Sequence, residues 1–278
     1  MTATTATTAM TAMTMSPSAE PRGASTRSEF VSVGDLGRGM SVHGDVLPAV
    51  DDLSGRVLDL DGERVAFGDD GTADLGGARG AVLVTSLRPG VLLARQLSGS
   101  RGLELLVLAD GGYTRVSAQL PDEETARESA WTRVQRGDEP TGVAAAFRHG
   151  LLEPGGRVHG PTGELVGMRN RYMYSPTESY EHIYLSEHRY TWHCLSGVEA
   201  GLADTDACDA IGVADDLVLF VWREKIVPTL GAVLIDLQQL RTDGAIFGDD
   251  AFEPGDATVF PVGSRFEIAN MTAYLAPA

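Results

Sequence analysis

Residues 172–185 read Tyr-Met-Tyr-Ser-Pro-Thr-Glu-Ser-Tyr-Glu-His-Ile-Tyr-Leu, and this stretch decides the fold together with the runs that follow it. Those runs cover residues 188–195, 217–224 and 232–237. Each is short, rich in aromatic and β-branched residues, and bounded by Gly, Pro or Asp, which is typical of β-strands. Most of the Tyr and Trp of the chain lies here. The second half is therefore predicted to be a set of strands rich in aromatic side chains.

The first half carries a plainer version of the same pattern between residues 30 and 120. Residues 55–61 and 64–67 flank a Gly-Glu turn and predict a hairpin. Further apolar runs joined by tight turns occupy residues 81–85, 91–95, 104–108 and 113–117. Short strands at this spacing indicate a meander that packs as a sandwich or closes into a barrel. We therefore expect an all-β protein.

One helix is predicted between the halves. Asp122 can cap it, and Ala126, Ala130 and Val134 follow at helical spacing, which indicates about four turns. Residues 137–162 contain several Pro and Gly and are interpreted as a linker.

Two tandem modules follow from this order, one over residues 30–150 and one over residues 151–278. Blocks of similar sequence in the two halves favour duplication of a single antiparallel module. Residues 1–29 are rich in Thr, Ala, Ser and Met and are expected to form a disordered tail, because they contain too little apolar surface to offset the entropy of ordering.

The composition excludes several classes of protein. A formal net charge of −17 argues against binding to nucleic acid or to an anionic membrane, since both need clustered Lys and Arg. Two cysteines cannot build a disulfide scaffold, and they fit a reducing cytoplasm. No apolar run approaches twenty residues, so no membrane span is predicted.

The candidate chemistry lies on the strands of the second half. Side chains two apart share one face of a strand, so Tyr172 and Tyr174 point the same way, and Glu224 ends a row that contains Phe220 and Trp222. Desolvation at the end of an apolar row would raise the pKa of the Glu224 carboxyl and let it act as a general acid or base. The two phenols could donate hydrogen bonds to a carboxylate or an oxyanion.

Other residues of these strands complete the predicted site. Tyr180 and His182 share a face and are candidate proton relays, while Phe220, Trp222 and Trp192 would form an apolar wall. A plainer interpretation stays open, because aromatic residues on strands are often ordinary half-buried core. Glu224 could equally lie in water, paired with Lys225.

No metal or nucleotide cofactor is expected. The histidines lack the spacing of a metal site, and the loop at residues 76–80 lacks the Lys-Ser/Thr of a phosphate-binding loop. Residues 204–209 read Asp-Thr-Asp-Ala-Cys-Asp but lack the central Gly and the distant Glu of a calcium loop. A capped turn or short helix is predicted there.

Four segments resemble the family named molybdenum cofactor biosynthesis protein F, or MoaF. They cover residues 174–184, 190–199, 201–206 and 220–230. The similarity extends from about residue 30 to the end of the chain and is most specific after Gly163. It implies two lipocalin-like (calycin) modules. The family name points to pterin–molybdenum metabolism, which no motif of this chain indicates.

The second half is also similar to the phenolic acid decarboxylases, which are cofactor-free β-barrel enzymes. Their signature is Tyr-x-Tyr, a further Tyr six residues on and a later Trp-x-Glu, met here by Tyr172, Tyr174, Tyr180, Trp222 and Glu224. This resemblance implies that the tyrosines hold a substrate carboxylate and that the glutamate handles the phenolic end. Leu202 occupies the place of that family's arginine, which leaves Arg189 or Arg223 as the source of a cation.

The sequence thus predicts two tandem lipocalin-like antiparallel β-barrel modules joined by a helix and a linker, with the ligand cavity in the second. The expected function is cofactor-free acid–base chemistry, lyase or isomerase, on a small apolar or aromatic molecule. A non-catalytic carrier or sensor with the same cavity is the alternative, and a duplication with a filled core is a third. The expected partner is a small molecule, with a homodimer left open.

Overall fold

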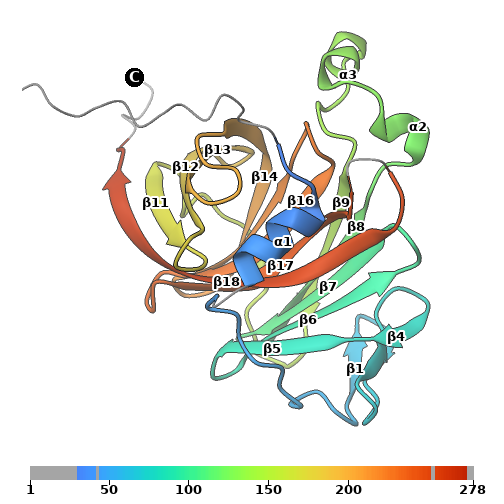
Figure 1. Cartoon of the computed structure of the whole chain (residues 1–278). Coiled ribbons are helices and arrows are strands. Elements are labelled where there is room, and N and C mark those ends of the chain that lie inside the picture. The colour runs from blue at the N-terminus through green and yellow to red at the C-terminus, as the bar shows by residue number, and fades with distance from the viewer. Residues whose placement is uncertain (1–29, 42–43, 252–253, 274–278) are drawn as a thin grey trace, which may run out of the picture.

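A closed antiparallel barrel of eight strands dominates the computed structural model, which describes residues 30–41, 44–251 and 254–273 (Figure 1). Its strands run in the order β14-β13-β12-β11-β18-β17-β16-β15, and β15 pairs back with β14. They are β11 (Met168–Met173), β12 (Ser179–Ser186), β13 (Arg189–Ser196), β14 (Ala203–Ala214), β15 (Leu217–Arg223), β16 (Thr229–Asp236), β17 (Arg241–Asp249) and β18 (Ala257–Met271). The short β10 (Gly160–Pro161) extends the sheet beside β14. The all-β class and a closed antiparallel barrel in the second half are confirmed, whereas the predicted tail, residues 1–29, lies outside the described residues.

Three neighbouring strands of the barrel wall, β15, β16 and β17, are buried on both faces. On β15, Val218, Phe220 and Trp222 join the apolar cluster inside the barrel. The alternate residues Leu219 and Val221 point outward and join a second apolar cluster. Such two-sided burial explains why this strand reads as a continuous apolar run rather than as a polar–apolar alternation.

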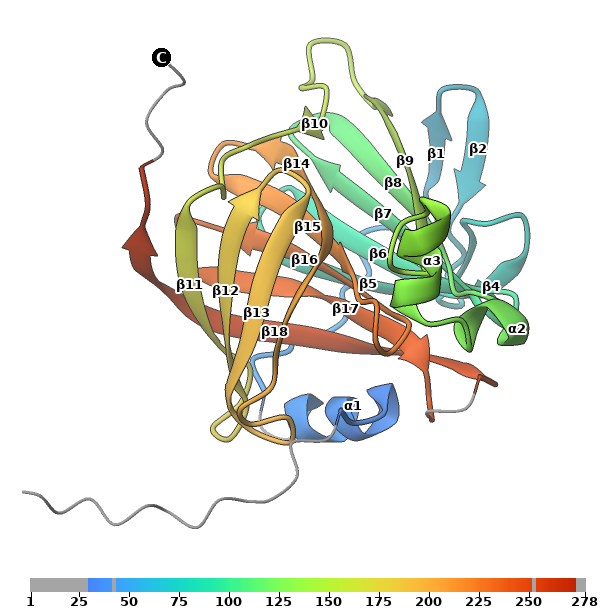
Figure 2. The same ribbon diagram turned by 90° about the horizontal axis from the view of Figure 1, so that it is seen from above.

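The second cluster is the contact between the two halves of the chain. A five-stranded meander, β5-β6-β7-β8-β9, lies face to face with the barrel wall (Figure 2). Its strands are β5 (Leu83–Arg88), β6 (Val91–Ser98), β7 (Gly102–Ala109), β8 (Gly112–Gln119) and β9 (Ala144–Leu151). Leu93 and Leu105 belong to its barrel-facing side, with Leu219 and Val221 opposite.

The other face of this sheet is covered by two hairpins. They are formed by β1 (Val57–Leu60) with β2 (Glu63–Ala66), and by β3 (Thr72–Asp74) with β4 (Arg79–Ala81). Because the first-half strands lie in three separate sheets, a second closed barrel is not seen among the described residues. Both faces of the five-stranded sheet are already buried, one by the barrel and one by the hairpins, so the sheet has no need to curl around a core of its own.

Three sequence-based predictions about helices and the linker are wrong. The expected single helix is two short helices, α2 (Glu123–Ala126) and α3 (Ala130–Arg136). Ser129 accepts a hydrogen bond from the backbone N–H of Thr132 and so caps the start of the second helix. Strand β9 falls within the predicted linker at residues 137–162. Near the start of the first half, which was predicted to be all-β, α1 (Val33–Ser41) is helical.

Residues 204–209 were also predicted wrongly, because they form part of the long strand β14 rather than a turn or helix. Their polar side chains are satisfied by cations on the next strand and just beyond it. Asp209 accepts from Arg223, and Asp206 accepts from Lys225. Among the helices of the described residues, none is long and apolar enough to cross a membrane.

Candidate active site

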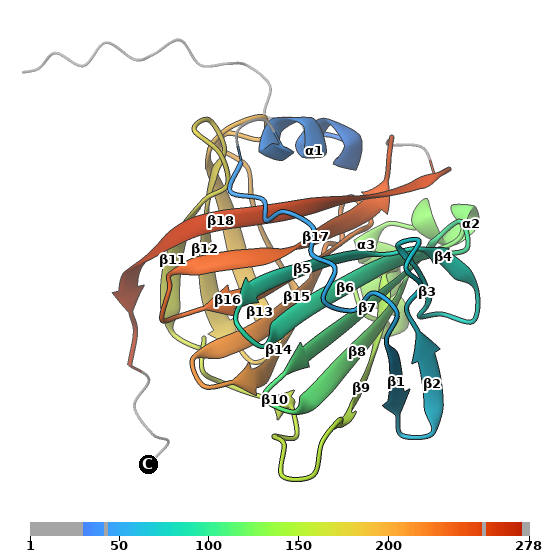
Figure 3. The ribbon, with the colours of Figure 1, turned by 90° about the horizontal axis from the view of Figure 1, so that it is seen from below.

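A small cavity lies inside the barrel, beneath α1. Its volume is about 20 Å³, which is room for about one water molecule. Aromatic and ionisable side chains dominate its lining: Leu36, Met40, Tyr174, Tyr180, His182, Tyr190, Trp192, Glu199, Trp222, Glu224 and Ile246. Helix α1 packs against β17 and β18 (Figure 3). Its residues Leu36 and Met40 contribute to the cavity lining.

Strand pairing brings the aromatic side chains together. His182 on β12 lies opposite Trp192 on β13, and Tyr184 lies opposite Tyr190. The His182 ring is in contact with the rings of Tyr172 and Tyr190, at centroid distances of 4.7 and 5.1 Å. The aromatic side chains that were predicted to share one face of a strand therefore point into the barrel.

Tyr172 and Tyr174 have different surroundings despite sharing a face. The Tyr172 hydroxyl accepts a hydrogen bond from Asn170 Nδ2 at 3.0 Å and lies 2.6 Å from the Tyr184 hydroxyl. It is therefore satisfied within the core and does not line the cavity. The buried Tyr174 does line it, and its hydroxyl has no hydrogen-bond partner among the described residues. Of the two predicted donors, Tyr174 is the one positioned to meet a ligand.

Glu224 follows β15 directly and turns its carboxyl group into the cavity. Trp222 Nε1 donates a hydrogen bond to Glu224 Oε1 at 3.0 Å. Burial raises the pKa of Glu224 well above its ordinary value, and the nearby charges of Asp206 and Glu199 raise it further. The alternative pairing with Lys225 is not observed, because the Lys225 ammonium donates to Asp204 and Asp206 instead.

A second carboxyl group lines the cavity, and sequence reasoning missed it. Glu199 lies between β13 and β14 and accepts a hydrogen bond from the Tyr180 hydroxyl at 3.1 Å. Burial raises the pKa of Glu199 above its ordinary value. Its position in an irregular segment gives no periodic signal that could have revealed it. Tyr190 was also missed as a lining residue, although its strand was predicted correctly.

His182 is an uncharged imidazole in this environment. Burial lowers its pKa to about 3. Its Nδ1 atom lies 3.5 Å from the Tyr184 hydroxyl, a long contact. Phe220 packs beside it, with ring centroids 6.2 Å apart, and lies deeper in the core without lining the cavity. A neutral imidazole can both give and accept a proton, so the geometry is compatible with a relay.

The two predicted arginines lie away from the cavity. Arg189 forms an ion pair with Glu139 at 3.3 Å, and Arg223 forms one with Asp209 at 2.7 Å. Leu202 is part of the apolar barrel core. Of the described residues that line the cavity, none is Lys or Arg, whereas two are Glu. The described residues also contain no group of three or more His, Cys, Asp or Glu that could hold a metal ion.

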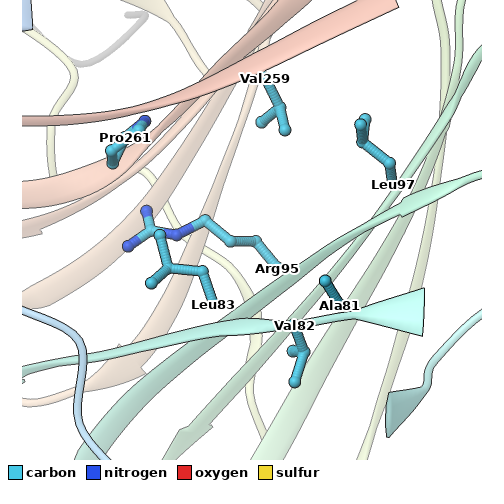
Figure 4. Close-up of a pocket in the computed structure, with 7 residues that line it drawn as sticks. All are labelled: Ala81, Val82, Leu83, Arg95, Leu97, Val259 and Pro261. Carbon is cyan, nitrogen blue, oxygen red and sulfur yellow. The ribbon is translucent and has the colours of Figure 1, made fainter. Parts of the chain in front are cut away.

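A larger pocket, about 390 Å³, lies between the two halves and is a weaker candidate (Figure 4). Apolar side chains of β4–β6 and β18 form it, together with Arg95. The Arg95 guanidinium already has partners within the protein, because it donates hydrogen bonds to the Gly244 carbonyl and to the Thr85 hydroxyl. Size favours this pocket, but only the barrel cavity combines carboxyl groups, phenols and an imidazole.

The barrel and its cavity are also the part that a known family model matches. The model of the MoaF C-terminal domain matches residues 159–272. The protein named MoaF from Klebsiella aerogenes is 40% identical over 263 residues, which cover 90% of this chain and 99% of that one. The chain belongs to the MoaF family.

The matched family segment contains every strand of the barrel and all the cavity residues except Leu36 and Met40 of α1. The similarity to the Klebsiella MoaF extends over most of the first half as well. A crystal structure of a β-lactamase candidate from Burkholderia vietnamiensis covers 37% of this chain and 93% of its own, with a TM-score of 0.33 and 10% identity.

Proposed function

We propose that the barrel cavity binds a small, largely apolar or aromatic molecule and performs acid–base chemistry on it without a cofactor, as a lyase or an isomerase. One observation carries the proposal. A carboxyl group with a raised pKa, Glu224, lines an aromatic cavity that is also lined by a phenol, Tyr174, whose hydroxyl has no hydrogen-bond partner among the described residues. A filled structural core would be expected to satisfy such groups internally.

The roles follow from protonation states. Because its pKa is raised, Glu224 keeps its proton to a higher pH than an ordinary carboxyl group and can donate that proton to a developing oxyanion or carbanion of the ligand. Its conjugate base can then take a proton from another position, which completes an isomerisation or an elimination. The Tyr174 hydroxyl can donate a hydrogen bond to the same developing charge. His182 and the hydrogen-bonded pair Tyr180–Glu199 also line the cavity, so they could return protons to Glu224.

The test begins with the ligand that co-purifies with the protein, identified by native mass spectrometry. Turnover of that ligand is then compared between the wild type, Glu224→Gln and the exposed control Glu187→Gln. We expect Glu224→Gln to lose about 10²–10⁴-fold in rate while still binding the ligand, because general acid–base catalysis contributes on that scale. Unchanged turnover in Glu224→Gln contradicts the proposal. Binding without turnover in the wild type favours the carrier.

A further inference from the structure

We infer that the barrel cavity receives the positively charged head group of an amine, and not a carboxylate. The inference deepens the proposed function and rests on it, because it requires the barrel cavity to be the ligand site. Four features of the cavity carry it: its aromatic faces, its carboxyl groups, its unpartnered hydroxyls and its size.

The aromatic lining is the first feature. Five of the eleven lining residues are Tyr or Trp, contributed by β12, β13 and β15 and by Tyr174, which follows β11. Trp222 packs its ring 5.9 Å from His182 and 6.2 Å from Tyr190, so the rings enclose the space from several sides. The faces of aromatic rings are negative and attract ammonium groups, and cages of such rings recognise alkylated amines.

The charge of the lining is the second feature. Glu199 and Glu224 both reach the cavity. Asp206 lies behind Trp192 and accepts a hydrogen bond from its Nε1 at 2.9 Å. Lys225 is the nearby cation, and it is held by Asp204 and Asp206. A ligand carboxylate would meet two carboxyl groups and no lining cation, whereas an ammonium would stabilise the ionised form of either glutamate.

The unpartnered polar groups are the third feature and are independent of the carboxyls. Tyr174 and Tyr190 are about 2% and 1% exposed, and within the described part of the chain neither hydroxyl has a hydrogen-bond partner. Both line the cavity, as does His182, whose Nε2 atom is likewise unpartnered there. Hydroxyl oxygens and a neutral imidazole nitrogen are acceptors that suit the three N–H donors of an ammonium.

The size of the cavity is the fourth feature. A volume of about 20 Å³ admits a group of the size of a water molecule, which is also the size of an ammonium head. A water molecule would satisfy the hydroxyls but would bring no positive charge to the two glutamates, whose ionised forms burial disfavours. The cavity has no room for the apolar body of the amine, so Leu36 and Met40 of α1, which cover the cavity, would have to move to admit it.

Three probes with one aromatic body and different charges test this inference. Benzylammonium, benzyl alcohol and benzoate are titrated into the full chain at pH 7 by calorimetry. We expect benzylammonium to bind at least about tenfold more tightly than benzyl alcohol. Benzoate should not bind at concentrations that saturate the protein with the ammonium. Glu224→Gln and Glu199→Gln should each remove most of the ammonium preference, while Glu187→Gln should keep it.

The outcomes separate the inference from the proposed function. If benzyl alcohol or benzoate binds as tightly as benzylammonium, the amine inference is overturned while the cavity remains a ligand site. If none of the three probes binds, the inference is overturned as well, and the co-purified ligand then decides the proposed function. Circular dichroism of each variant shows that it is folded, and retained alcohol binding in the Gln variants shows that the cavity is intact.

Discussion

At the scale of single residues, the barrel cavity disfavours the charged forms of its ionisable groups. Burial raises the pKa of Glu224 and lowers that of His182, so the charged form of each group is disfavoured for the same physical reason. A buried charge without a partner costs several kcal/mol, and taking up or releasing a proton avoids that cost. The same two shifts have opposite consequences for stability as the pH changes.

Glu224→Gln should therefore change how stability depends on pH. The folded-state pKa of Glu224 lies above its ordinary value of 4.5, so its contribution is complete below that value and is lost as the pH rises towards the folded pKa. We expect the wild type and Glu224→Gln to have equal free energies of unfolding near pH 4. Above pH 4.5 the variant should become progressively more stable than the wild type.

Urea unfolding at pH 4, 6 and 8 measures this difference. His182 acts in the opposite direction, because its folded pKa of about 3 makes its contribution fade as the pH falls from 6.5. Its effect is common to both proteins and cancels in the comparison. A difference between the proteins that stays constant with pH would show that the Glu224 carboxyl is not desolvated.

At the scale of elements, two close approaches of glycine shape the cavity. On α1, a Cβ at Gly37 would lie 2.8 Å from the Phe260 ring, so glycine lets the helix sit close to β18. On β16, Gly231 lies opposite Trp222, and a Cβ there would fall 1.9 Å from the indole ring. The indole can lie over β16 only because this position has no side chain.

Gly231→Ala is expected to displace the Trp222 indole and weaken its hydrogen bond to Glu224. Overpacking of this kind costs about 1–3 kcal/mol in unfolding free energy. Gly160→Ala is the matched control, since a Cβ at Gly160 meets no atom within 4 Å. Chemical unfolding and near-ultraviolet circular dichroism, which reports the packing of tryptophan, measure the two effects. Identical behaviour of the two variants would contradict the close approach.

The elements also show what the sequence could predict. Period-two patterns identify the strands of the barrel and their inward faces, and they correctly group six residues of the cavity lining: Tyr174, Tyr180, His182, Trp192, Trp222 and Glu224. Helix α1 was hidden because its apolar residues Val33, Leu36 and Met40 are interspersed with three glycines, which weaken a helix. Arg189 and Arg223 were misplaced because strand periodicity does not reveal which ion pair a long side chain joins.

At the scale of the whole molecule, three arginines of the first half pair with three aspartates of the barrel. The pairs are Arg88–Asp236, Arg95–Asp243 and Arg101–Asp249, each spanning 148 residues. They run along the same junction as the apolar contact between the five-stranded sheet and the barrel wall. Sequence alone could not reveal these three ion pairs, because it does not show that the two distant segments lie side by side in the folded chain.

The central pair, Arg95–Asp243, is the strongest test of this junction. Its closest N···O distance is 3.6 Å, and the two side chains are 2% and 0% exposed. Arg95→Met would leave the Asp243 carboxylate buried without its cation, at an expected cost of about 3–5 kcal/mol in unfolding free energy at pH 7. The double variant Arg95→Met/Asp243→Asn should recover most of that loss, because it removes the charge while keeping an oxygen acceptor for Thr85.

Guanidinium unfolding of the wild type, both single variants and the double variant measures this coupling between the halves. The loss in Arg95→Met should shrink as the pH falls, because the pKa of Asp243 is already raised by burial and protonation would neutralise the stranded carboxylate. If the double variant is as unstable as Arg95→Met at every pH, the cost comes from lost packing and from the lost hydrogen bond to Gly244. The ion pair would then not be what couples the sheet to the barrel.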